Sequence, residues 1–112
     1  MTEIISIPFE YNDGSHTALV RCTVVNFTPQ IRVTIMNGEL EAMLSGNHIL
    51  LLEGGKLRPA FECPTSAIQL LQQNIIRAIE KCDDFHQMYR NFIADRLRNE
   101  LHNSNQYLQH FV

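Results

Sequence analysis

Residues 64–101, PTSAIQLLQQNIIRAIEKCDDFHQMYRNFIADRLRNEL, decide the fold of this chain. The stretch has no glycine, and its only proline is its first residue. Glycine and proline interrupt local structure more than any other residues, so a long tract without them that carries apolar residues at helical spacing predicts helix. The glycines (14, 38, 46, 54 and 55) and prolines (8, 29, 59 and 64) all lie at or before position 64. We therefore expect a sheet of strands separated by turns at glycine and proline, followed by helices that pack on it.

The helical part is expected to contain two helices. Ser66 and Gln69 have the spacing of a capping box, which places the first helix start near Ser66. A first apolar stripe at spacings of three and four comprises Ile68, Leu71, Ile75, Ile79 and Cys82, and a second comprises Phe85, Met88, Tyr89, Phe92, Ile93, Leu97 and Leu101. The spacing also fits one bent helix, but Asp83 and Asp84 lie between the stripes and suit a helix N-terminus, so we favour two. We expect the second helix to end at Asn103-Ser104-Asn105.

The earlier part of the chain shows the period-two alternation of half-buried strands. Strands are predicted over residues 5–11, 16–27, 31–35, 49–52 and 56–61, and Pro8 marks the first as an edge strand. Turns are predicted at 12–14, with Gly14 at positive φ, at 28–30 and at Gly54-Gly55. Residues 39–44 fit either a strand or one helical turn. Because Asn37-Gly38 before them is a strong hairpin signal, we favour a strand.

These elements predict one α+β domain over residues 1–112. Its fold class is an antiparallel meander sheet of four or five strands followed by two C-terminal helices packed on one face. The sheet part spans 1–63, the helical part 64–102 and a tail 103–112. A chain of this length is near the commonest domain size and can bury a single core.

Charge and composition exclude several classes of function. The net charge is −3, and neither the acidic sheet part nor the neutral helical part supplies the basic face that nucleic acid requires. No apolar run is long enough to cross a membrane, and the start of the chain lacks the pattern of a secretory signal. Three cysteines at irregular spacing fit reduced thiols. We therefore expect a cytoplasmic protein that binds neither nucleic acid nor membranes.

Four residues are candidates for ligand binding, namely Cys63, Cys82, His86 and His48. A zinc site needs three or four converging ligands, and the irregular spacing here leads us to expect neither a metal nor another cofactor. Cys82 also lies on the first apolar stripe, where a free cysteine acts as a small hydrophobe. Cys63, just before the first helix, comes nearest to the setting of a reactive thiolate. No nucleophile motif surrounds it, so we assign no catalytic residue.

The feature with most weight for function is the surplus of apolar residues near the C-terminus. Tyr107, Leu108 and Phe111 lie in a tail that would otherwise fray, and we predict that they form an interface. The favoured hypothesis is a non-enzymatic protein-interaction or self-associating module, most simply a homodimer. The alternative is a small-ligand-binding protein or small enzyme with its site between the sheet and the helices.

Overall fold

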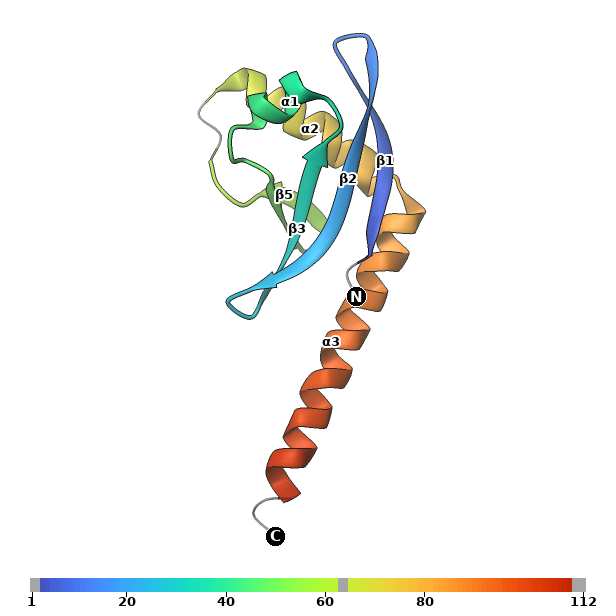
Figure 1. Cartoon of the computed structure of the whole chain (residues 1–112), viewed down its shortest axis with the longest axis vertical. Helices are drawn as coiled ribbons and strands as arrows, with labels where there is room; N and C mark the ends of the chain where they lie inside the picture. Colours follow the sequence, from blue (N-terminus) through green and yellow to red (C-terminus); the bar gives the residue numbers. More distant parts are fainter. Residues whose placement is uncertain (1–2, 63–64, 110–112) are drawn as a thin grey trace.

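The computed structural model shows an α+β fold with one antiparallel meander sheet and helices after it (Figure 1). The structure describes residues 3–62 and 65–109, and the side chains of the last helix as far as Arg98. The strand order β1-β2-β3-β4-β5 follows the sequence, which confirms the predicted fold class. The elements are β1 (Ile4–Tyr11), β2 (Gly14–Val25), β3 (Thr28–Ile35), α1 (Gly38–Leu44), β4 (Ile49–Glu53), β5 (Lys56–Pro59), α2 (Ser66–Glu80) and α3 (Asp83–Gln109).

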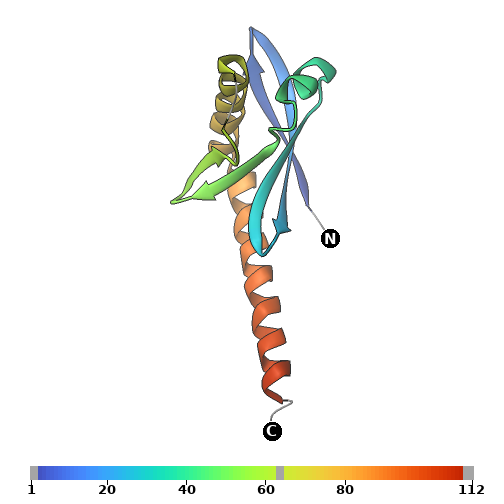
Figure 2. The same ribbon diagram turned by 90° about the vertical axis from the view of Figure 1, so that its left-hand side faces the viewer.

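The sheet curls around α2. This helix contacts both edge strands, β1 and β5, so the two ends of the meander approach the same helix (Figure 2). Alternate strand residues face α2, as the period-two pattern requires. The buried core comprises chiefly Ile7, Phe9, Tyr11, Ala18, Val20, Cys22, Ile31, Val33, Ile35, Leu50 and Leu57 from the strands, and Leu71, Ile75, Ile76, Ile79, Phe85 and Met88 from the helices.

The predicted division into two helices is confirmed, with one correction to the capping residue of the first helix. Thr65, and not Ser66, is the N-cap of α2, and its hydroxyl accepts a hydrogen bond from Ile68 N at 3.2 Å. Both residues carry a hydroxyl that could cap a helix. The predicted helix start at Ser66 is therefore confirmed, whereas the predicted capping residue is wrong by one position. The first helix ends at Glu80 and α3 begins at Asp83, with two acidic residues in its first turn.

The predicted strand over residues 39–44 is wrong, because these residues form α1. Asn37 is not part of a hairpin turn. Its side-chain oxygen accepts hydrogen bonds from Glu39 N and Leu40 N, both at 3.1 Å, which is N-cap geometry. Leu40 and Leu44 are buried on the inner side of this short helix, and α1 contacts β3 and α2.

The turns follow the expected types but not all the expected positions. Between β1 and β2, Asn12 and Asp13 adopt positive φ, whereas Gly14, predicted to do so, is the first residue of β2. The predicted turn at 28–30 is wrong: the turn lies at Asn26 and Phe27, and Pro29 pairs with Val24 inside the ladder. The predicted Gly54-Gly55 hairpin and the edge position of β1 are confirmed.

The last helix extends well beyond the rest of the molecule (Figures 1 and 2). It has 27 residues and continues to Gln109, so the predicted helix end at Asn103-Ser104-Asn105 is wrong. Its first turns pack against the core through Phe85 and Met88. Its remaining length gives the molecule extents of 63 × 27 × 25 Å. Within the described residues, no helix combines the length and apolar character that a membrane span needs.

Candidate functional site

Two of the predicted ligand residues, Cys82 and His86, lie together at the junction of α2 and α3. His86 Nε2 lies 2.7 Å from Glu80 O, and because a carbonyl oxygen only accepts, the imidazole donates. This bond satisfies a carbonyl at the end of α2 that has no partner within its own helix. Cys82 is half-buried and packs against the hydrophobic core. Both residues therefore have structural contacts that account for their positions.

His48 lies away from that junction. It lines a small cavity together with Gln72 and Ile75 of α2, whereas His86 bonds to Glu80 at the C-terminal end of the same helix. Gln72 and Glu80 are separated by eight helical residues, or about 12 Å. The structure thus separates His48 from Cys82 and His86, and Cys63 lies outside the described residues. Within the described part of the chain, no three His, Cys, Asp or Glu side chains gather as a metal site would require.

The space between the sheet and α2 near His48 is filled by side chains. The cavity bounded by Val33, Leu44, Leu50 and Ile75 measures about 10 Å³, which is room for one water molecule at most. Ligand pockets are commonly some 300 Å³ or more. Any small-ligand site near His48 must therefore lie on the surface.

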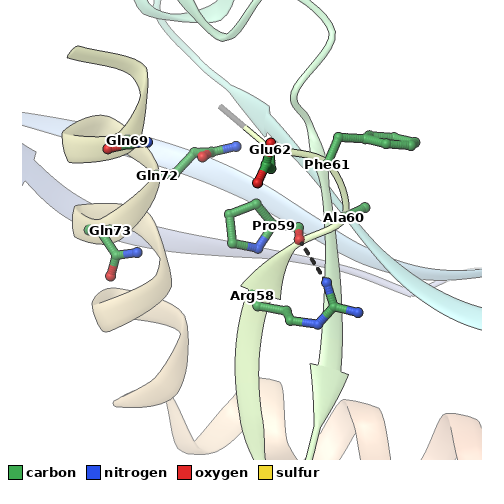
Figure 3. Close-up of a pocket in the computed structure, with 8 residues that line it drawn as sticks. All are labelled: Arg58, Pro59, Ala60, Phe61, Glu62, Gln69, Gln72 and Gln73. Carbon is green, nitrogen blue, oxygen red and sulfur yellow. Dashed lines mark hydrogen bonds between the residues drawn. The ribbon is translucent and has the colours of Figure 1, made fainter. Parts of the chain in front are cut away.

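A larger groove runs between α2 and the end of β5 (Figure 3). It measures about 480 Å³ and is lined by Gln69, Gln72 and Gln73 on the helix and by residues 58–62 opposite them. Gln72 donates to Asn47 O at 3.1 Å. Arg58 is already paired with Glu53 through two hydrogen bonds of 2.8 and 2.6 Å. This salt bridge lowers the pKa of Glu53, chiefly through its hydrogen bond to Arg58, so the groove's one arginine is held by a carboxylate.

A second cleft lies on the sheet face turned away from α2. It measures about 320 Å³, and its polar lining residues are Arg21, Arg32, Thr34, Glu41 and His48. His48 Nε2 lies 2.9 Å from Glu41 Oε1, and the same carboxylate oxygen accepts from Ile35 N at 3.1 Å. Glu41 is thereby fixed at the wall of the cleft by two hydrogen bonds.

The third surface is at the end of the molecule where α3 leaves the body. There β2 and β3 continue as a two-stranded ribbon beyond β1. The pairing of β1 with β2 begins only at Ile4 and Arg21, whereas β2 and β3 pair as far as Val25 and Thr28. Phe27 forms the tip of this ribbon with φ 65° and a side chain that is 88% exposed. A bulky residue at positive φ is unusual. We call the exposed apolar residues at this end the tip surface: Ile4, Val24, Val25, Phe27 and Leu97.

Contacts from α3 hold the ribbon in place beneath the tip surface. Arg96 donates a hydrogen bond to Phe27 O, and Tyr89 lies near enough to Cys22 for the thiol to affect its pKa. Burial raises the pKa of Cys22 to about 11, with the nearby Glu3 carboxylate adding to the effect. Burial also raises the pKa of Tyr89. The nearby Cys22 raises this pKa further, and the positive charge of Arg96 lowers it. Both groups are neutral at pH 7 and act as packing residues.

No protein-family model matches this chain, and no curated protein or solved structure matches it significantly. The site must therefore be argued from the residues themselves. The sequence analysis did not single out Arg21 and Arg32, because only the strand register shows that they are opposite each other. Phe27 was missed as well, since its exposure depends on where the turn falls. The predicted interface residues Tyr107 and Leu108 lie on α3 beyond Arg98, where side chains are not described, and Phe111 lies outside the described residues.

Proposed function

We propose that this chain is a non-enzymatic self-associating module whose partner is a second copy of itself. The observation that carries the proposal is α3, whose backbone leaves the body next to the tip surface and continues to Gln109 away from every other element drawn (Figure 1). At 1.5 Å per residue the whole helix is about 40 Å long. Among its side chains that the structure describes, those as far as Arg98, the buried core residues Phe85 and Met88 lie in the first two turns.

A helix in this situation needs a partner on physical grounds. Most helical stability in proteins comes from the packing of an apolar face, and short isolated helices are marginal in water. The sequence after Leu97 is rich in residues of low helix propensity, including Asn99, His102 and the run Asn103-Ser104-Asn105. Leucines 97, 101 and 108 nevertheless recur at spacings of four and seven, as along a coiled-coil seam. This pattern supports helix-to-helix pairing.

A second copy is the simplest occupant of this surface. The tip surface combines an apolar ribbon and the beginning of the projecting helix, so two copies related by a two-fold axis would each offer the same pair of elements. The outer face of the sheet is a poorer interface because Arg21 and Arg32 are exposed on it. Self-association would also cover Phe27, whose exposure is otherwise unfavourable.

We propose further that the module acts in the cytoplasm and binds neither nucleic acid nor membranes. Cys22 and Cys82 are free thiols, as expected in a reducing compartment. The net charge of −3 is unfavourable for binding phosphate backbones.

The test is the solution mass of the full chain by light scattering between about 1 µM and 1 mM, a range that corresponds to association free energies of roughly −8 to −4 kcal/mol. We expect a dimer that Leu97→Glu converts to a monomer, since the substitution would bury a charge in the interface. Leu70→Glu is the matched control: Leu70 is 53% exposed on α2, and Leu97 is 55% exposed on α3. A wild-type monomer throughout this range, or equal dissociation by both substitutions, would overturn the proposal.

A further inference from the structure

Arg21 and Arg32 are directly opposite each other on neighbouring strands β2 and β3. Like charges in that position repel and destabilise a sheet. Both residues are exposed on the face away from α2, and among the described residues neither guanidinium group has an ion pair or hydrogen bond. Arg58, on the same face at the edge of the sheet, shows the contrasting arrangement, because its charge is met by Glu53 at 2.6 Å. The central pair of arginines is therefore left without the anion that such an arrangement favours.

The two arginines line the same 320 Å³ cleft as Thr34 and His48. This volume is at the lower end of the range for small-molecule pockets. Thr34 is on the same face as Arg32, two residues along β3, and its hydroxyl is a further donor. His48 precedes β4, and Ile49, the first residue of that strand, pairs with Arg32. Two neighbouring strands thus bring donors to one place, and His48 borders it from the start of the third.

The one carboxylate in the cleft, Glu41, is already engaged. Its Oε1 atom accepts from His48 Nε2 at 2.9 Å and from Ile35 N at 3.1 Å. Because an ionised carboxylate only accepts hydrogen bonds, His48 Nε2 carries the hydrogen of that contact. Two guanidinium groups face one carboxylate, so the charged groups of the cleft leave an excess of positive charge even when His48 is neutral.

We propose that this cleft binds a small phosphate-bearing ligand through Arg21 and Arg32. The planar guanidinium group presents paired donors that match phosphate oxygens, and two of them on adjacent strands would share the charge of a dianion. The bound phosphate would also relieve the repulsion between the arginines. The cleft adjoins the tip surface, because Ile4 pairs with Arg21, but it uses different side chains. Phosphate binding measured in Leu97→Glu therefore tests this proposal apart from self-association.

The test is a titration of the full ¹⁵N-labelled chain with inorganic phosphate, followed by amide chemical shifts at constant ionic strength. We expect saturable shifts at Arg21, Arg32, Thr34 and His48, and binding at least about tenfold weaker in Arg32→Gln, a loss of about 1.4 kcal/mol. The substitution removes a like-charge repulsion, so the variant should fold, which its unchanged distant amides would verify. Arg58→Gln is the matched control on the same face of the sheet and should bind phosphate as the wild type does.

Three results would overturn the proposal. The first is a shift that does not saturate, which indicates a general salt effect. The second is equal weakening by Arg32→Gln and Arg58→Gln, which would indicate attraction to the whole face. The third is binding of acetate as tightly as phosphate, because the cleft would then not distinguish a phosphate from a carboxylate. A rise in the unfolding temperature with phosphate that disappears in Arg32→Gln would support the site independently.

Discussion

Thr23 and Gln30 are opposite each other on β2 and β3, two residues along the ladder from the arginine pair. Thr23 Oγ1 and Gln30 Oε1 are buried without a hydrogen-bond partner within the described part of the chain. A buried polar group without a partner loses its hydrogen bonds to water and forms none in the protein, which lowers the free energy of unfolding by about 1–3 kcal/mol. We therefore expect Thr23→Val, which keeps the β-branched shape, to raise the free energy of unfolding by about 1 kcal/mol.

Urea denaturation measures this effect, and Thr17→Val provides the control. Thr17 is on the same face of β2, and its hydroxyl is not among the buried atoms that lack a partner, so the same substitution there should change the free energy of unfolding little. If Thr23→Val were no more stable than Thr17→Val, the buried hydroxyl would not carry the cost assigned to it.

At the scale of elements, the sequence predicted best where the apolar pattern is long. The stripe from Ile68 to Ile79 continues for several turns, and its helix begins at Ser66 as predicted, with only the capping residue wrong by one position. The seven residues of α1 are too few to distinguish a strand period of two from a helical period of 3.6. Asn37-Gly38 favoured the wrong prediction of a strand, because asparagine suits both hairpin turns and helix N-caps. Local pattern also could not locate the outer-face cleft, since the arginines meet through strand register and His48 arrives through the loop after α1.

The cap at Asn37 provides the prediction for this scale. One side-chain oxygen satisfies the backbone N–H groups of both Glu39 and Leu40. Asn37→Ala should therefore lower the free energy of unfolding by about 1 kcal/mol and speed amide exchange at those two positions. Asn37→Asp retains an accepting oxygen and should restore both properties, as measured by urea denaturation and hydrogen exchange. Wild-type stability in Asn37→Ala would mean that α1 is held by burial of Leu40 and Leu44 alone.

At the scale of the whole molecule, the exposed apolar residues are unevenly distributed. Ile4, Val24, Val25 and Phe27 are exposed at the end of the sheet where β2 and β3 extend beyond β1. The exposed Leu97 follows Arg96, whose side chain bonds to Phe27 O, so the group comes from three separate stretches of sequence. The sequence indicated an apolar surplus at Tyr107, Leu108 and Phe111 and did not single out the tip surface, because the grouping of its residues depends on the overhang of β2 and β3 beyond β1 and on the direction of α3. Both are properties of the assembled fold.

This arrangement predicts that α3 has two parts of different stability. Its first turns are tied to the core by Phe85 and Met88, so their amides should exchange in step with those of Ile75 and Ile79. The part after Leu97 has poor helix formers and should be protected only when two copies pair. Dilution below the association midpoint, or Leu97→Glu, should speed exchange there by about tenfold or more while α2 is unchanged, as followed by amide hydrogen exchange. Slow exchange in a verified monomer would show that the helix persists alone, and the stability of α3 would then no longer call for a second copy.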